Sequence, residues 1–214
     1  MIRVLLIDDH PVVRTGYKRL LLQEPGIEVV AEAANADEGY QAFQLHLPDV
    51  TVTDVSMPGP GGLSLLEKIL QRQADAKVLV CSMYDSVQVV QRALQTGAKG
   101  FVSKNAQPEE LVRAVHAVHR GETHPRNHLK ADASSGALDD EAQRIASLTA
   151  REFDIFRLLA QGKSVAECAD AMHLSQKTIS NHQTQIKDKL QLASLAAMVH
   201  LAQRHHVIDS PADL

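Results

Sequence analysis

The stretch MIRVLLIDDH, residues 1–10, decides the fold prediction for the first half of the chain. Its apolar run from Ile2 to Ile7 ends on two adjacent carboxylates, Asp8 and Asp9. A short apolar run of this kind is typical of a strand that is buried on both faces of a parallel sheet. Two neighbouring carboxylates repel each other at neutral pH, so they need a compensating cation. The stretch therefore predicts a buried strand with an acidic site at its carboxyl end.

Four more runs of this type follow and alternate with segments of helical periodicity. The five predicted strands are residues 2–7, 28–34, 49–55, 77–83 and 99–103. The helices predicted between and after them are residues 13–22, 37–46, 63–72, 87–95 and 108–120. This alternation is the signature of a parallel α/β sheet. We therefore predict an α/β domain of five strand–helix units over residues 1–120.

The rest of the chain changes character twice. Residues 121–146 read GETHPRNHLKADASSGALDDEAQRIA, where periodicity fades and turn-forming residues accumulate, so we predict a linker. Residues 147–208 are purely helical in pattern, and three helices begin with capping residues, Thr149, Ser164 and Ser175. The helices predicted at 164–172 and 175–190 are separated by only two residues. This close spacing predicts a small all-α helix-turn-helix domain.

Composition narrows the functional classes. The net charge of −4 divides evenly between the two halves, so no basic tail or acidic arm indicates nucleic acid or a membrane surface as partner. The two cysteines, Cys81 and Cys168, lie far apart in apolar patterns, which indicates packing roles in a reducing compartment. The chain opens with a strand pattern and has no apolar run long enough to span a membrane. We expect a cytoplasmic protein with no membrane segment.

Polar residues stand at the ends of four predicted strands. Asp8 and Asp9 end the first strand, and Asp54 closes the third. Ser82 lies at the end of the fourth strand, and Lys104 follows the fifth. Ligands of doubly wound sheets bind beyond the carboxyl ends of the strands, where the strand order reverses. These five side chains are therefore candidates for one site.

The chemistry of these groups suits the transfer of a phosphoryl group. Ligands that are all oxygen favour a hard ion, so we predict Mg²⁺ bound by Asp9, with Asp8 in support, by Asp54 and by the backbone carbonyl of Ser56. Asp54 would act as the nucleophile. The hydroxyl and the ammonium at the other two strand ends would hold the phosphoryl oxygens.

These motifs resemble the receiver domain of bacterial two-component response regulators. The matching features are DD after the first strand, D-x-x-M-P at the third, S at the fourth and an aromatic residue three positions before K at the fifth. Residues 146–208, with LTAREFDIFRLLAQGKSVAECADAMHLSQKTISNHQTQIKDKL, resemble the LuxR-type output domain of the NarL/FixJ subfamily. The resemblance implies a flavodoxin-like receiver, phosphorylation of Asp54 by a sensor histidine kinase, and control of DNA binding. It also implies that Ser82 and Phe101 swing inward as a switch.

Three features depart from the family pattern. Position 101 is Phe where many receivers carry Tyr, so packing alone would report the switch. The loop 58–62, PGPGG, lacks the acidic or amide residue often found there, which leaves the lifetime of the phosphoryl group open. No lysine stands at positions 180, 181 and 184, so two modules on two half-sites are expected to share the work of binding.

The helix predicted at 175–190 has two distinct faces. Ile179, Ile186 and Leu190 gather on one side and face the domain core. The opposite side collects the candidate DNA contacts, Lys177, Ser180, Asn181 and Thr184, flanked by Lys187 and Lys189. In the family, the positions of Ser180, Asn181 and Thr184 read bases of double-stranded DNA, while the flanking lysines are placed for phosphates. A last helix at about 193–206 is apolar on more than one face, which the resemblance assigns to a homodimer contact.

Other hypotheses stay open. An aspartyl phosphate also serves metal-dependent phosphohydrolases, but the haloacid-dehalogenase type needs D-x-D and would have no use for residues 146–208. A constitutive DNA-binding regulator with a silent receiver is a third hypothesis. His116, His119, His124 and His128 have spacing that could bind zinc, yet they straddle a helix end and the linker. We expect no enzyme activity beyond aspartyl phosphotransfer and autodephosphorylation as steps of signalling.

Overall fold

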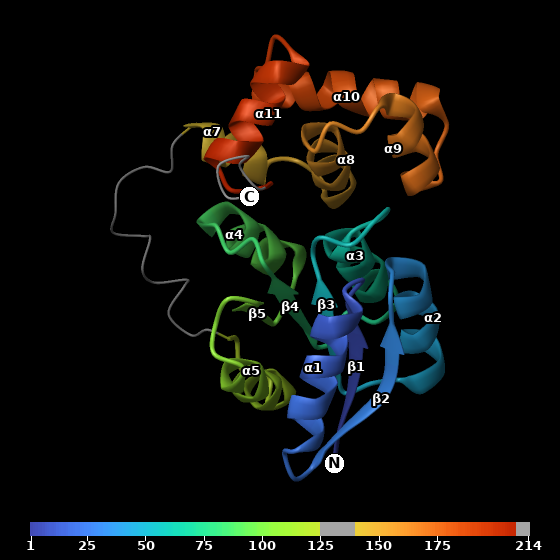
Figure 1. Cartoon of the computed structure of the whole chain (residues 1–214), viewed down its shortest axis with the longest axis vertical. Helices are drawn as coiled ribbons and strands as arrows, with labels where there is room; N and C mark the ends of the chain where they lie inside the picture. Colours follow the sequence, from blue (N-terminus) through green and yellow to red (C-terminus); the bar gives the residue numbers. More distant parts are fainter. Residues whose placement is uncertain (125–139, 209–214) are drawn as a thin grey trace. The chain divides into compact units, whose positions relative to one another are not determined.

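The structure of the chain is a computed structural model that describes residues 1–124 and 140–208 (Figure 1). These residues form two compact units, one of residues 1–83 and 93–124 and one of residues 84–92 and 140–208. His128, part of the zinc hypothesis, and most of the predicted linker lie outside the described residues. No helix within the described residues is long and apolar enough to cross a membrane.

The first unit is built on a five-stranded parallel sheet with the strand order β2-β1-β3-β4-β5. The strands are β1 Ile2–Ile7, β2 Ile27–Ala33, β3 Val50–Asp54, β4 Val78–Ser82 and β5 Gly100–Ser103. The order reverses between β1 and β3, where ligands bind in sheets of this topology. The predicted flavodoxin-like α/β domain is confirmed, and its crevice lies at the acidic strand ends.

Helices cover both faces of the sheet (Figure 1). They are α1 Pro11–Leu22, α2 Ala36–His46, α3 Gly62–Arg72 and α5 Glu109–His119. The helix α4 Val87–Thr96 follows β4 in the chain, and its residues 87–92 belong to the second unit. Contacts join α1 to α5 and, as a separate pair, α2 to α3. Between the sheet and the first pair, Val4, Leu6, Val52, Leu79 and Val115 form part of one buried apolar core. Burial of this surface holds the strand ends in place.

The second unit is helical. Its helices are α7 Asp140–Ala146, α8 Ala150–Ala160, α9 Val165–Met172, α10 Gln176–Leu190 and α11 Leu195–Arg204. Thr149 and Ser164 form capping boxes with Glu152 and Glu167, as predicted. His173 ends α9 in the left-handed conformation, with φ of 52°, and the Ser175 side chain caps α10. The predicted helix-turn-helix is therefore confirmed.

The structure differs from the predicted linker at both of its ends. Asp140–Ala146 forms α7, which contacts α10 and buries Ala142 and Ile145. Only two of its side chains are buried, too few for a clear helical period in the sequence. At the other end, the N–H of Phe101 donates to the carbonyl of His124 at 2.8 Å. The N–H of His124 in turn donates to the carbonyl of Lys99 at 3.0 Å. The sheet unit thus extends beyond residue 120.

Candidate functional site

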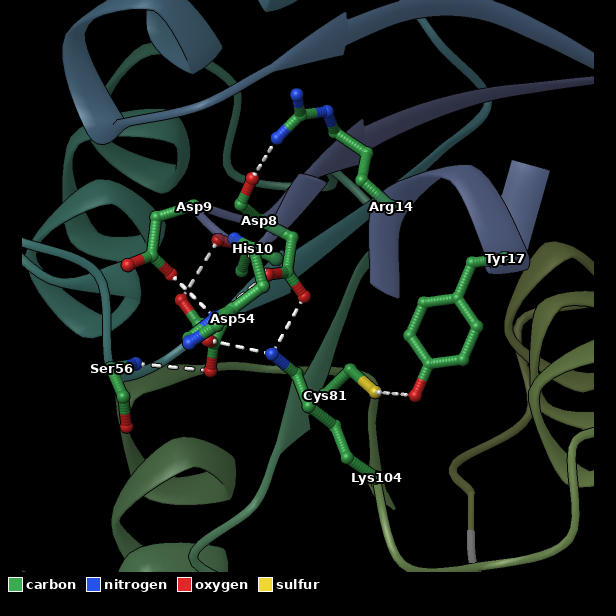
Figure 2. Close-up of polar contacts among 10 residues, drawn as sticks. Asp8, Asp9, His10, Arg14, Tyr17, Asp54, Ser56, Cys81 and Lys104 are labelled. Atoms are coloured by element: carbon green, nitrogen blue, oxygen red, sulfur yellow. Dashed lines mark hydrogen bonds and ion pairs between the residues drawn. The ribbon is translucent and has the colours of Figure 1, made fainter. Parts of the chain in front are cut away.

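Asp54 lies at the carboxyl end of β3, beside the end of β1 that carries Asp8 and Asp9 (Figure 2). The side chains of Asp54 and Asp8 are only 2% and 7% exposed. The N–H of Ser56 donates to Asp54 Oδ1 at 3.0 Å, which fixes the orientation of the carboxylate. The three predicted carboxylates therefore meet at one strand edge, as the strand-end pattern indicates.

Lys104, which follows β5, places its ammonium between two of these carboxylates (Figure 2). Its Nζ lies 2.6 Å from Asp8 Oδ2 and 2.8 Å from Asp54 Oδ2. Burial alone would lower the pKa of Lys104, but the carboxylates of Asp54 and Asp8 outweigh burial and raise it. Lys104 is therefore charged at neutral pH and neutralises part of the acidic cluster.

One ammonium does not compensate for the whole cluster. Burial raises the pKa of Asp54; Lys104 and the N–H of Ser56 oppose this effect, and Asp8 adds to it. Asp9 brings a third carboxylate within reach. A further cation would stabilise the ionised form of Asp54, because an opposite charge at close range favours ionisation.

The cluster has donors that could hold such a cation. Asp8, Asp9, His10 and Asp54 each offer one ligand atom, and these atoms lie within 4.8 Å of one another. Opposite ligands of an octahedral ion with bonds of about 2.1 Å stand roughly 4.2 Å apart. The ligand atoms would therefore have to approach one another only slightly to bind one ion. His10 was missed in the sequence, although it follows Asp9 directly in the opening stretch.

The predicted switch residues, Ser82 and Phe101, lie in the neighbouring strands β4 and β5. Ser82 ends β4 and is fully buried, one residue beyond Cys81, which pairs with Asp54 in the sheet. Phe101 of β5 pairs with Val80 of β4. Phe101 is only 4% exposed, so its ring is already buried in this structure. Ser82 thus lies at the same edge as the carboxylates, and Phe101 lies within the strand that positions Lys104.

A contact that sequence reasoning missed joins α1 to β4 beside the cluster. The hydroxyl of Tyr17 lies 3.3 Å from the sulfur of Cys81, and both line a cavity of about 10 Å³ with Asp8, Arg14 and Asp54. Burial raises the pKa of Cys81 to about 12, and burial also raises that of Tyr17. Both groups are neutral at physiological pH, which agrees with the packing role predicted for Cys81.

The outer side of α10 carries the candidate DNA contacts. Lys177, Ser180, Asn181 and Thr184 are exposed, and Lys187 is partly buried. The hydroxyl of Thr184 donates to the carbonyl of Ser180 at 3.1 Å, so its free lone pairs and its methyl group remain for a base edge. The buried residues of α10 are Ile179, Ile186 and Leu190, as the helical wheel predicts.

Lys189 differs from the other candidate contacts because its ammonium is engaged within the domain. Its Nζ lies 2.7 Å from Glu152 Oε2, and the side chain of Glu152 is only 6% exposed. The same carboxylate accepts the N–H of Thr149 at 2.7 Å. A phosphate contact from Lys189 would have to break this ion pair. Gln185, which is not among the predicted DNA contacts, is also exposed, one turn beyond Asn181.

Known proteins match both units of the chain. The family model of the response regulator receiver domain matches residues 4–116, and that of bacterial regulatory proteins of the luxR family matches residues 146–202. The chain is 35% identical to the oxygen regulatory protein NreC of Staphylococcus carnosus, covering 97% of this chain and 99% of NreC. It is 33% identical to the response regulator UvrY of Escherichia coli, covering 96% of this chain and 95% of UvrY.

Nearly the full length of the chain also resembles the solved structure of a DNA-bound protein. It is RcsB from Salmonella enterica serovar Typhimurium, bound to promoter P1flhDC in the presence of the phosphomimetic BeF3⁻. The TM-score is 0.74 and the sequences are 27% identical, over 95% of this chain and 98% of the RcsB chain.

Proposed function

The chain belongs to the NarL/FixJ subfamily of two-component response regulators, and we propose that phosphorylation of Asp54 controls its binding to promoter DNA. A receiver domain joined to a LuxR-type DNA-binding domain makes it a transcriptional regulator. One observation carries the proposal about Asp54. Its buried carboxylate lies at the reversal point of the sheet, 2.8 Å from the ammonium of Lys104 and beside two further carboxylates.

In the proposed reaction, a carboxylate oxygen of Asp54 attacks the phosphorus atom of a phosphohistidine on a sensor histidine kinase. The bond from phosphorus to the histidine nitrogen breaks as the acyl phosphate forms. Lys104 and the Ser82 hydroxyl hold the oxygens of the phosphoryl group, whose charge needs cations and donors. Hydrolysis of the acyl phosphate by water returns the carboxylate, so autodephosphorylation ends the signal.

Mg²⁺ fits the donor chemistry of this site. Asp8, Asp9 and Asp54 would hold it together with the backbone carbonyl of Ser56, and the remaining positions suit water and phosphoryl oxygens. When bound, the ion supplies positive charge beside the reacting oxygens. The raised pKa of Asp54, caused by burial, supports this assignment because a neighbouring cation favours the ionised nucleophile.

A change at the phosphoryl group has a physical route to the end of the receiver. Lys104 binds the acidic cluster through its side chain, and its N–H donates to the carbonyl of Ser82 at 2.8 Å. Phe101, three residues earlier in the chain, donates its N–H to the carbonyl of His124, which lies within the predicted linker of residues 121–146. We propose that movement of Ser82 and Phe101 on phosphorylation shifts this hydrogen bond and so reaches the segment before the DNA-binding domain.

The DNA-binding domain would use α10 as its recognition helix. Ser180, Asn181 and Thr184 would contact base edges in the major groove, and Lys177 and Lys187 would contact phosphates. Lys189 would join them only after leaving Glu152. The DNA-bound RcsB structure, solved with a phosphomimetic, supports the coupling of phosphorylation to DNA binding.

A homodimer is the proposed DNA-binding form. Met198, Leu201 and Ala202 of α11 are buried in the domain, whereas Leu195 is 40% exposed. The side of α11 that carries Leu195 and the partly buried Val199 is therefore available for the same helix of a second protomer.

The function is tested with Asp54→Asn, because an amide cannot serve as the nucleophile. The exposed Asp75→Asn is the matched control with the same change of charge. Each protein is treated with acetyl phosphate and Mg²⁺, run on a phosphate-affinity gel, and titrated with promoter DNA. We expect a mobility shift and tighter DNA binding for the wild type and for Asp75→Asn, and neither for Asp54→Asn.

The result also separates the competing hypotheses. A mobility shift in Asp54→Asn would refute the assignment of the phosphoryl acceptor. Phosphorylation of the wild type without any change in DNA affinity would favour a silent receiver. Sustained turnover of a phosphoester substrate would instead favour a phosphohydrolase.

A further inference from the structure

One side chain of the acidic cluster, that of His10, has no part in the phosphoryl transfer described above. His10 precedes α1 as its N-cap residue, but its side chain makes no capping hydrogen bond. Its imidazole instead lies over the cluster, with Nδ1 3.1 Å from Asp9 Oδ1 and 3.4 Å from Asp8 Oδ1 (Figure 2). The main chain holds it there, because the N–H of His10 donates to Asp8 Oδ1 at 2.8 Å and Pro11 begins the helix.

These separations match the geometry of ligands on one ion. Two atoms bound at adjacent positions of an octahedral ion, with bonds of about 2.1 Å, lie about 3 Å apart. The imidazole nitrogen has this relation to Asp9, and it belongs to the group of ligand atoms that lie within 4.8 Å of one another. The distance from the nitrogen to Asp9 Oδ1 therefore suits two adjacent ligands of one cation.

The imidazole and the ammonium of Lys104 approach different oxygens of the cluster. Lys104 contacts the Oδ2 atoms of Asp8 and Asp54, whereas His10 faces the Oδ1 atoms of Asp8 and Asp9. An ion beside His10 would thus leave the buried contacts of Lys104 in place. An ion pair of His10 with Asp9 is the simpler interpretation, but the imidazole is 59% exposed, and exposed ion pairs contribute little to stability.

We propose that His10 is a nitrogen ligand of the divalent ion in this site, which thereby takes a transition-metal ion as well as Mg²⁺. Mg²⁺ prefers oxygen ligands, whereas imidazole suits borderline ions such as Co²⁺, Ni²⁺ and Zn²⁺. The inference rests on the proposed function of the acidic cluster and adds a ligand that changes its metal selectivity.

The test compares Co²⁺ and Mg²⁺ binding to the full chain by isothermal titration calorimetry. The variants are His10→Ala and, as a matched control, the exposed His200→Ala in α11. Because His10 makes no side-chain cap, its removal is not expected to disturb the start of α1. We expect the Co²⁺ dissociation constant to rise roughly tenfold or more in His10→Ala alone, with less than about a twofold change for Mg²⁺.

Pulsed EPR of bound Mn²⁺ gives a direct readout of the ligand. A hyperfine coupling to ¹⁴N is expected in the wild type and in His200→Ala, and it is expected to vanish in His10→Ala. Equal Co²⁺ constants in the wild type and His10→Ala, or no nitrogen coupling in the wild type, would overturn the role of His10.

Asp9→Asn distinguishes this failure from a failure of the proposed function. Unchanged Mg²⁺ binding in Asp9→Asn would show that the acidic cluster is not the cation site, and both ideas would fall. Loss of Mg²⁺ binding in Asp9→Asn, with no effect of His10→Ala on either ion, would refute only the nitrogen ligand.

Discussion

A single methyl group at Gly62 is expected to displace the proposed nucleophile. Gly62 begins α3, and its N–H donates to the carbonyl of Val55 at 3.1 Å. A Cβ atom at this position would overlap the carbonyl oxygen of Asp54 and would lie 2.8 Å from its carbonyl carbon. To restore an ordinary contact of 3.4 Å to that carbon alone, the end of β3 or the start of α3 must retreat by about 0.6 Å, and relief of the overlap with the nearer carbonyl oxygen requires a larger shift.

The size of the effect follows from what has to move. Overpacking costs about 1–3 kcal/mol, and we expect Gly62→Ala to lie at the upper end because backbone atoms must yield. Misplacement of a reacting group by about 1 Å can slow a reaction by roughly a hundredfold, so phosphoryl uptake should slow at least tenfold. Gly16→Ala in α1 is the matched control, since a Cβ atom there meets nothing within 4 Å. It should stabilise the protein by about 0.5–1 kcal/mol.

Two measurements test this prediction on the full chain. Urea unfolding followed by circular dichroism gives the change in free energy, and a time course on a phosphate-affinity gel gives the rate of uptake from acetyl phosphate. A Gly62→Ala variant with wild-type stability and a wild-type rate would refute the close approach of Gly62 to Asp54.

Three further predictions concern polar and charged side chains. Lys104→Met should lower the free energy of unfolding, measured with urea at pH 7, by about 3 kcal/mol, because it leaves buried carboxylates uncompensated. Added Mg²⁺ should recover part of this loss, and an unchanged midpoint of urea unfolding would contradict the prediction. Lys187→Ala should weaken specific and scrambled duplexes equally and lower the salt slope by about one unit, whereas Asn181→Ala should cost about 1–3 kcal/mol on the specific duplex only. Burial alone would raise the pKa of Glu152, but the ion pair with Lys189 outweighs burial and lowers it. The pair therefore stabilises the domain fully above the unfolded carboxyl pKa of about 4.3, and this stabilisation is lost as the pH falls below that value. Glu152→Gln should therefore flatten the melting temperature between about pH 5 and pH 3, and an unchanged pH profile would argue against the pair.

The strand ends show how far local pattern reaches. Parallel strands place their carboxyl ends at one edge, so the positions of Asp54 and Lys104 in the chain were enough to predict that they meet. Their contact at 2.8 Å joins residues that are 50 positions apart in the sequence. The two faces of α10 followed in the same way from the helical period of 3.6 residues.

Other partners had no such local signal. Glu152 and Lys189 are 37 positions apart, and Tyr17 and Cys81 are 64 apart; each pair meets only because its two elements pack together. Glu152 is readable in the sequence as a helix cap, and its second role as the anchor of Lys189 is not. The short helix α7 was also missed, because it is stabilised by packing against α10 rather than by a strong period of its own.

The sequence by itself determined the class of fold, the helix-turn-helix, and the carboxylates and the lysine of the acidic edge, because period, capping and strand-end position are properties of neighbouring residues. Tertiary structure alone decided which oxygen each cation faces. Lys104 contacts the Oδ2 atoms of Asp8 and Asp54, while His10 turns its imidazole over the Oδ1 atoms of Asp8 and Asp9. Side-chain orientation depends on the packing of several elements around one edge, and this arrangement is not encoded in the spacing of the residues along the chain.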